Sequence, residues 1–198
     1  MKRILYLTLI FSFLSFSISA FSQGKEVVQD QTETRGGLLY LKGKAEPYTG
    51  IVYKLYPDSE IEITMTYKSG ILEGEYMEWY ENRNIRYKTS YRGGIVDGPF
   101  ISYYKNGNIE RTGTMKNNKK EGLFKSWYEN GQLEQETTYK AGEKDGVSIY
   151  YYENGKQETK EIYVNGVEHG TFQWFTEDGD LEYEEVYDMG KLKSSKEY

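Results

Sequence analysis

A chain of 198 residues has room for one domain or at most two. Its net charge of −6 disfavours nucleic acid and anionic membranes as partners, because both need a basic face. The absence of Cys excludes disulfides, Cys-based zinc sites, thiol nucleophiles and a lipid anchor on an N-terminal Cys. With 21 Tyr and 21 Gly against 3 Pro, the composition favours an all-β fold of strands and turns.

The N-terminus has the pattern of an export signal. Lys2 and Arg3 precede the apolar run Ile4–Ile18, and small residues lead to a cleavage point before Gln23. We therefore predict that residues 1–22 are a signal peptide, and that cleavage takes the net charge from −6 to −8 by removing two basic residues. The alternative is a retained anchor helix, but the run is shorter than the roughly 20 apolar residues that spanning requires. The prediction places the mature chain in the periplasm, on the outer surface or in the medium, with no integral membrane segment.

The segment after the signal is polar and weakly patterned. Residues 23–36 are therefore predicted to be a flexible linker. A short strand is expected at Leu38–Lys42, within a repeat domain that covers residues 37–198.

Glycines recur every 24 residues and define six units of the repeat domain, which start at Gly50, Gly74, Gly98, Gly122, Gly146 and Gly170. We number each unit from this glycine as position 0. Positions 6 and 17 are Tyr in five of the six units, and position 11 is Ile or Leu in five. Two turn signals per unit leave no room for a helix. The pattern predicts tandem β-hairpins that form one elongated, twisted antiparallel sheet.

Two turns are expected in each unit. Asn-Gly or Asp-Gly occupies positions 8 and 9 in the last four units, which favours a two-residue type I′ turn. A second reversal is expected over positions 18–23, where position 20 is Gly or Asn118. The two-residue turn would pair position 6 with 11, 5 with 12 and 0 with 17. A larger residue at position 0 should then clash with the position-17 ring.

This register predicts which side chains share a face. One face carries positions 2, 4, 6, 11, 13, 15 and 17, and the other carries 3, 5, 12, 14 and 16. Alternation would make the second face polar, yet position 5 is large and apolar in every unit. We take its aromatic residues, rimmed by Glu at position 12, as a candidate binding stripe: Trp79, Tyr103, Trp127, Tyr151 and Phe175. The alternative is that these rings pack on each other, on Lys and Arg stems or under the next twist of the sheet.

No constellation of catalytic or metal-ligating residues stands out. His169 is the sole histidine, and nothing in the sequence marks a partner for it. Acidic residues recur in the second turn, at Glu73, Asp97, Glu121 and Asp145. Stacked carboxylates could bind Ca²⁺, but each unit offers only one, whereas calcium takes six to eight oxygen ligands. We therefore interpret these residues as parts of solvated turns. Neither a phosphate loop nor a nucleophile elbow is present. We predict no catalytic residue, no metal, no cofactor and no enzymatic activity.

Two motifs carry a resemblance to a known family. The unit pattern G-x-aromatic-x-x-W/Y-Y-x-N-G-x-L/I, followed by Y-x-x-G-x-x-D/E-G, resembles the bacterial variant of the MORN repeat, and in particular the YwqK-type antitoxin repeat family. The segment Glu46–Gly50 resembles the entry to the first repeat of that family. The resemblance implies consecutive hairpins in one long sheet, a binding role outside or inside the cell, and, from the antitoxin label, a partner protein that is neutralised.

Three hypotheses on function follow. The first is an exported, non-enzymatic scaffold that binds an envelope or secreted protein through the stripe. The second is a glycan- or cell-wall-binding module, because other Tyr/Trp-rich hairpin repeats stack sugars on aromatic rings. The third is an antitoxin-like neutraliser of a partner protein. An enzyme is disfavoured because no polar groups converge, and nucleic acid is disfavoured by charge.

Overall fold

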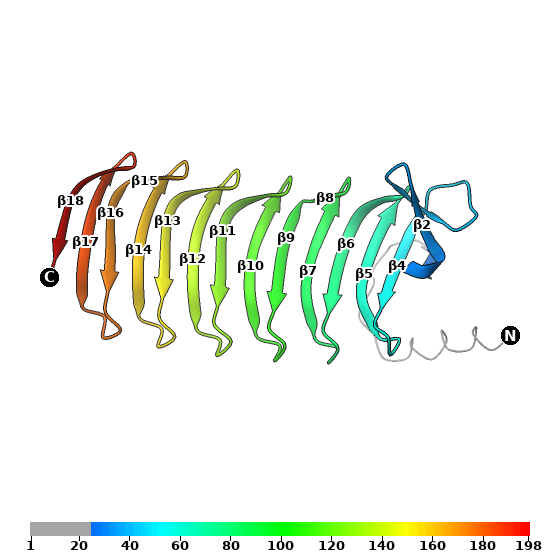
Figure 1. Cartoon of the computed structure of the whole chain (residues 1–198), viewed down its shortest axis with the longest axis horizontal. Helices are drawn as coiled ribbons and strands as arrows, with labels where there is room; N and C mark the ends of the chain where they lie inside the picture. The colour runs from blue at the N-terminus through cyan, green and yellow to red at the C-terminus, as the bar shows by residue number, and fades with distance from the viewer. Residues whose placement is uncertain (1–24) are drawn as a thin grey trace.

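The structure is a computed structural model that describes residues 25–198. Consecutive hairpins stand side by side in one long row, with one set of turns along the upper edge and another along the lower edge (Figure 1). The elements are β1 (Lys25–Val28), η2 (Gln29–Gln31), β2 (Thr32–Arg35), β3 (Leu38–Leu41), β4 (Gly50–Leu55), β5 (Ile61–Lys68), β6 (Ile71–Trp79), β7 (Ile85–Arg92), β8 (Ile95–Val96), β9 (Gly98–Tyr103), β10 (Ile109–Lys116), β11 (Lys119–Trp127), β12 (Leu133–Lys140), β13 (Glu143–Tyr151), β14 (Gln157–Val164), β15 (Val167–Glu168), β16 (Gly170–Phe175), β17 (Leu181–Asp188) and β18 (Lys191–Glu197).

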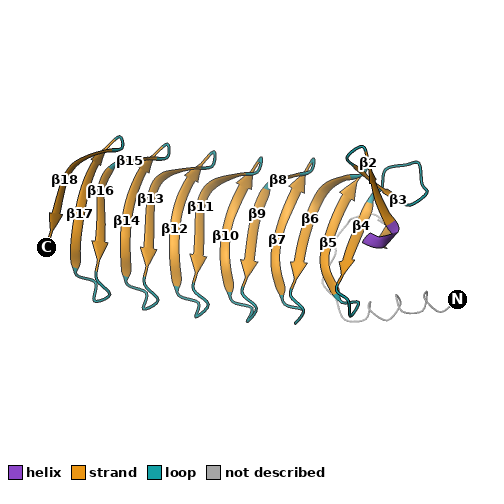
Figure 2. Ribbon diagram, in the orientation of Figure 1, coloured by secondary structure: helices purple, strands orange, loops and turns teal. Residues whose placement is uncertain are grey.

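The strands follow one another across the sheet in the order of the chain. Sixteen strands form one sheet from β1 to β18, and β2 and β3 form a separate small ribbon. Apart from the single-turn η2, the described chain consists of strands and loops (Figure 2). The predicted all-β fold of tandem 24-residue hairpins in one elongated sheet is confirmed. Because the sheet is one layer thick, its core is small. The buried apolar side chains are Tyr48, Val52, Phe124 and Phe172.

The predicted flexible linker is wrong for residues 25–36, which form ordered structure. Strand β1 pairs with β4 in parallel, the one exception to the antiparallel order, and β2 pairs with β3 across Gly36-Gly37. The Tyr48 hydroxyl donates a hydrogen bond to the carbonyl of Lys25, which fixes β1 on the edge of the sheet. Pairing with the open edge of β4 therefore orders a segment whose own sequence is polar and weakly patterned.

The predicted signal peptide, residues 1–22, lies outside the described residues. Within residues 25–198 no helix has the length and apolar character needed to cross a bilayer. The strand expected at Leu38–Lys42 is observed as β3.

The lower turns differ from the predicted type I′ geometry. In the fourth unit the position-6 carbonyl of Tyr128 accepts from the Gly131 N–H at 2.9 Å, and the Tyr128 N–H donates to the Gln132 carbonyl at 2.9 Å. Only position 9 has positive φ, for example 88° at Gly131. This is a three-residue loop, in which a type I turn is followed by a left-handed residue that forms a bulge. The Asn130 side chain stabilises it by accepting a hydrogen bond from the Gln132 N–H at 2.8 Å.

The extra loop residue changes the register at the strand ends. Position 5 pairs with position 11, as in Trp127 with Leu133, and the predicted pairing of 5 with 12 is wrong. Position 12 instead lies beside position 4, where Glu62 contacts Lys54 at 2.6 Å. The predicted pairing of position 0 with 17 is confirmed by Gly122 and Tyr139. Apolar side chains at position 11 therefore join the face of the stripe, and the predicted rim of position-12 Glu does not.

The upper turns have the type I′ geometry that was expected at the lower ones. Positions 19 and 20 both have positive φ, for example 51° at Ala141 and 96° at Gly142, between the paired residues Lys140 and Glu143. Each upper turn also bonds to the preceding one, since the Gly142 N–H donates to the Lys120 carbonyl at 2.9 Å. The upper edge is therefore a continuous stack of turns.

The glycine at position 0 marks a bend in the first strand of each unit. Its φ ranges from 79° at Gly122 to 148° at Gly50, a region that other residues adopt only with strain. The predicted clash with the position-17 ring is wrong, because a Cβ on Gly122 would meet no atom within 4 Å. The positive φ shared by all six positions explains this column of glycines, and at Gly50 a Cβ would in addition meet the Lys25 carbonyl oxygen and the Tyr48 ring within 3 Å.

Candidate functional site

The two faces of the sheet differ in how their aromatic rings are packed. We call the face with positions 2, 4, 13, 15 and 17 the inner face, and the face with positions 1, 3, 5, 11, 14 and 16 the outer face. On the inner face rings touch both between and within units: between centroids, Phe124 lies 5.5 Å from Phe100 of the preceding unit and 5.1 Å from Tyr139 of its own unit. Phe172 likewise lies 5.0 Å from Tyr187. These contacts bury apolar surface and give edge-to-face or tilted ring pairs.

The upper hairpins fold over the inner face. The Lys120 ammonium, at position 22, lies 4.4 Å from the centroid of the Tyr139 ring and 5.1 Å from that of Phe124. In the next unit Lys144 lies 4.5 Å from the Tyr163 ring. The bend at position 0 therefore lets cationic side chains cover rings that a flat sheet would expose.

A polar cluster interrupts the row of inner rings in the fifth unit. Position 2 is Ser148, which is fully buried, and Lys144 Nζ lies 3.0 Å from Glu161 Oε2 and 3.0 Å from Tyr150 Oη. Burial alone would lower the pKa of Lys144, but the hydrogen bonds with Tyr150 and Glu161 outweigh it and raise the pKa. This cluster replaces ring packing with charge-assisted hydrogen bonds. Lys144, Tyr150 and Glu161 are paired with one another, whereas the buried Ser148 Oγ has no hydrogen-bond partner among the described residues.

The candidate stripe runs along the lower part of the outer face. Its five aromatic residues are the last residues of β6, β9, β11, β13 and β16, so each stands next to a lower loop. All five are half-buried. Among residues 25–198 none of them takes part in a ring-to-ring contact, in contrast to the inner rings. The role of the stripe in binding remains a prediction.

Aliphatic side chains alternate with the aromatic ones along the stripe. Ile85 pairs with Trp79, and Leu133 pairs with Trp127, through the register of the lower bulge. Leu55, Ile85 and Ile109 are 36–39% exposed. Leu123 and Val147, at position 1 of the same face, are 50% and 40% exposed. The outer face therefore carries apolar side chains at positions 1 and 11 as well as at position 5, which was the only apolar position predicted for it.

Charges on the outer face are few and balanced. Three Lys and three Glu occupy its positions in the six units: Glu75, Lys88, Lys125, Glu136, Lys160 and Glu184. Lys88 contacts Glu75 at 2.8 Å, and Lys125 contacts Glu136 at 2.9 Å. The net charge of −6 therefore lies elsewhere on the chain. Depletion of unpaired charge together with aromatic enrichment is typical of the centre of a protein interface.

The Lys125–Glu136 pair fixes one stripe residue, Tyr151. The Tyr151 hydroxyl donates to Glu136 Oε1 at 2.9 Å. Hydrogen bonding from Lys125, opposed by burial and assisted by Tyr151, lowers the pKa of Glu136. Burial, followed by the hydrogen bond to Glu136, raises the pKa of Tyr151 to about 12. The hydrogen bond to Glu136 thus fixes the position of the Tyr151 ring on the outer face.

A ladder of tyrosines sets the spacing of the stripe. Each position-6 hydroxyl donates to the position-5 carbonyl of the next unit, from Tyr56 to Trp79 at 2.7 Å through Tyr152 to Phe175 at 2.7 Å. The sequence shows that position 6 is Tyr, but it does not show the acceptor of the hydroxyl. That acceptor is a backbone carbonyl 23 residues later, and the register that places it beside the hydroxyl was not predicted. The ladder ties the backbone of all five stripe residues to the preceding unit.

The lower loops are joined in the same way. The side chain of Asn106 donates to the Glu129 carbonyl of the next loop at 3.2 Å, and Asn154 donates to Glu177 at 3.0 Å. The loop residues themselves are exposed. The lower edge is therefore a regular array of loops, one per unit, beside the stripe.

The acidic turn residues have a structural partner. Glu121 accepts a hydrogen bond from the Ala141 N–H of the next upper turn at 2.8 Å, and Asp145 accepts from Asn165 at 3.1 Å. Within residues 25–198 no three His, Asp or Glu side chains gather as metal ligands. His169 occupies the same column, and its Nδ1 lies 3.9 Å from an Asp188 carboxylate oxygen. The column joins successive upper turns, which fits the solvated-turn interpretation over a calcium site.

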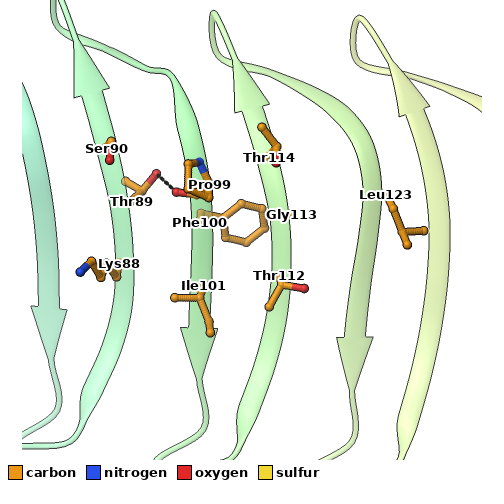
Figure 3. A pocket seen from close by; sticks show the side chains of 10 residues that line it. All are labelled: Lys88, Thr89, Ser90, Pro99, Phe100, Ile101, Thr112, Gly113, Thr114 and Leu123. Atoms are coloured by element: carbon orange, nitrogen blue, oxygen red, sulfur yellow. Dashed lines mark hydrogen bonds between the residues drawn. The ribbon is translucent and has the colours of Figure 1, made fainter.

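A shallow hollow of about 460 Å³ opens in the third unit of the sheet. Figure 3 shows its lining side chains: Lys88, Thr89 and Ser90 from β7, Pro99, Phe100 and Ile101 from β9, Thr112, Gly113 and Thr114 from β10, and Leu123 from β11. Its outer-face positions in the third unit carry no charged residue. The hollow lies beside the stripe residue Tyr103, two residues after Ile101 along β9.

The comparisons identify the repeat class. Residues 96–117, 120–141, 144–165 and 168–189 each match the family described as MORN repeat variant. Every match begins two residues before a position-0 glycine, in phase with the observed hairpins. These four segments are tandem MORN repeat variants. A comparison with curated proteins gives no match.

Proposed function

We propose that this repeat protein is a non-enzymatic scaffold that binds a partner protein through the stripe on its outer face. The observation that carries the proposal is the difference in ring packing between the faces. Inner rings contact one another, whereas the stripe rings have no ring partner within the described chain. Trp and Tyr in a surface depleted of unpaired charge are the residues that dominate binding energy in protein interfaces.

Export forms part of the same proposal. It is supported by the N-terminal pattern of a basic start, an apolar run and small residues before Gln23. The partner is then an envelope or secreted protein. The finer resemblance, to bacterial YwqK-type antitoxins, is compatible with this proposal because an antitoxin also acts by holding a partner protein.

Capture experiments with full-length protein test the proposal. The native chain, a Trp79→Ala/Trp127→Ala variant and a Tyr40→Ala/Tyr198→Ala control are immobilised and exposed to envelope and medium fractions. The control removes two Tyr rings that lie outside the stripe. A protein captured by the native and control chains but lost with the stripe variant supports the proposal, provided that circular dichroism is unchanged.

Two other results would overturn it. Equal capture by all three chains means that the stripe does not bind, and its rings then have a packing role only. Capture that soluble oligosaccharide competes away means that the stripe stacks on sugars, which is the glycan-binding alternative.

A further inference from the structure

Three Asn-Gly pairs occupy equivalent places in the lower loops, at positions 8 and 9 of the third, fourth and fifth units: Asn106-Gly107, Asn130-Gly131 and Asn154-Gly155. All three pairs are exposed, and their glycines have φ values between 82° and 93°. Asn-Gly is prone to deamidation, because glycine has no side chain that hinders the approach of its backbone nitrogen to the asparagine amide. The three pairs therefore differ mainly in what holds each asparagine side chain.

Deamidation joins the asparagine side chain to the next residue of the chain. The backbone nitrogen of the glycine attacks the side-chain amide carbon, and the new C–N bond closes a succinimide ring. The bond from that carbon to Nδ2 breaks, and the glycine N–H proton leaves with this nitrogen as ammonia. Water then opens the ring at either carbonyl and gives aspartate or isoaspartate. Because the side chain must turn toward the glycine nitrogen, hydrogen bonds that hold the amide slow the reaction.

Two such hydrogen bonds are common to all three loops. The glycine N–H donates to the position-6 carbonyl at 2.9 Å for Gly107, 2.9 Å for Gly131 and 2.8 Å for Gly155. The asparagine Oδ1 accepts from the position-10 N–H at 2.8 Å, 2.8 Å and 2.9 Å in the same order. These bonds slow the three sites alike.

A third hydrogen bond is present in only two of the loops. Asn106 Nδ2 donates to the Glu129 carbonyl of the next loop at 3.2 Å, and Asn154 Nδ2 donates to the Glu177 carbonyl at 3.0 Å. Among residues 25–198, Asn130 Nδ2 makes no such bond, and only its Oδ1 is held. The amide of Asn130 is therefore the least restrained of the three.

The residue at position 10 differs at the same joint. In the third unit it is Asn108, which also donates to the Glu129 carbonyl, at 2.9 Å. In the fourth unit it is Gln132, whose side chain is one methylene longer than that of Asn. Its Oε1 lies over Gly155, 3.3 Å from the place of a Cβ on that glycine. Within the described chain, the fourth and fifth loops therefore lack both of the side-chain bonds that join the third loop to the fourth.

We propose that Asn130 is a modification site, at which deamidation occurs first among the Asn-Gly pairs of the lower loops. The modification adds a negative charge three residues after Trp127. In the isoaspartate product it also adds a backbone atom to the loop whose bulge pairs Trp127 with Leu133. Deamidation of Asn130 thus changes the lower edge of the sheet beside the stripe, whether or not the stripe binds a partner protein.

Peptide mapping by mass spectrometry measures the rate at each site. Full-length protein is kept at mildly alkaline pH, once folded and once in concentrated urea, and the deamidated fraction is followed with time. In the folded chain we expect Asn130 to react about two- to tenfold faster than Asn106 and Asn154, the effect of one hydrogen bond fewer. In urea the three rates should be similar. Asn165-Gly166 is left out of the comparison, because it lies in an upper turn where Asn165 has a φ of 49°.

Two variants exchange the position-10 residue between the loops. Gln132→Asn gives the fourth loop the side chain of the third, and should slow Asn130 to about the rate of Asn106. Asn108→Gln makes the opposite change, and should speed the reaction of Asn106. Asn154 is the internal control, since its rate should stay the same in both variants.

Three results would overturn the proposal. Equal rates at the three sites of the folded chain, or a lower rate at Asn130, would mean that the missing bond has no effect. A difference of the same size in urea would assign it to the local sequence. Unchanged rates at Asn130 in Gln132→Asn and at Asn106 in Asn108→Gln would show that the joint between loops does not control the reaction.

Discussion

The inner and outer faces are made by the same hairpins, yet they use aromatic residues in opposite ways. On the inner face Phe124 is 8% exposed and touches rings of its own and the neighbouring unit. On the outer face Trp127 is half-buried and contacts no other ring in the described chain. Ring-to-ring packing in this single-layer sheet is therefore confined to one face, and the stripe rings of the other face have no ring partner in the described chain.

The largest contrast is expected from removing one ring on each face. Phe124→Ala should lower the free energy of unfolding by about 3–5 kcal/mol, because it leaves a cavity between packed rings. Trp127→Ala should lower it by only about 1 kcal/mol, because its ring is half-buried and unpaired. Urea unfolding measures both. Equal losses would mean that the outer rings also form part of the core.

The bend in the first strand of each unit depends on the glycine at position 0. Gly122→Ala should cost about 1–2 kcal/mol of stability, although the site has open space, because Ala must adopt a φ of 79°. Gly122→Asn should cost less, since Asn tolerates the left-handed region. Thermal unfolding of the two variants distinguishes backbone strain from crowding. A larger loss for Asn than for Ala would favour crowding.

The ladder that spaces the stripe makes a smaller contribution. Tyr128→Phe removes the hydrogen bond to the Tyr151 carbonyl and should cost about 1 kcal/mol. Amide hydrogen exchange should rise in the lower loops that Tyr128 joins, and the inner rings should be unaffected. Tyr40→Phe, outside the ladder, is the control. Unchanged exchange at the loops would contradict a spacing role.

The smallest effect is electrostatic and lies on the outer face. The pKa of Glu136 is lowered in the folded chain, so its stabilising contribution is present above the ordinary carboxyl range and is lost as pH falls through the folded pKa. At neutral pH, Glu136→Gln should cost about 0.5 kcal/mol, the scale of a partly exposed ion pair. The difference from the native chain should disappear in acid. Stability curves against pH check the sign, and a difference that grows in acid would refute it.

The sequence predicted the repeat, the hairpins and the place of each turn, because Gly and Asn-Gly occupy fixed positions whose backbone demands are local. It did not predict the kind of turn. Asn130-Gly131 suits both a two-residue type I′ loop and a three-residue loop with a bulge, and the observed choice moved Leu133 to the outer face. A difference of one loop residue was enough to change which side chains share a face.

Features that depend on distant partners were missed altogether. Lys25–Val28 reads as part of a polar linker, and only the free edge of β4 makes it a strand. Tyr128 was placed on the correct column, but its acceptor belongs to the next unit. The stripe residues were found because position 5 breaks the expected alternation of polar and apolar residues. Their lack of ring partners required the structure, since alternation does not reveal what packs against a side chain.

The hydrogen bonds that join neighbouring units connect residues only 20 to 23 apart in the chain. Such a molecule has a low contact order for a protein made of strands, because each strand of the repeat pairs with strands that are close to it in the chain. Folding can therefore begin at any pair of units and spread to both sides, and unfolding should start at the sheet edges. Excision of one complete 24-residue unit should leave a shorter protein that still folds cooperatively.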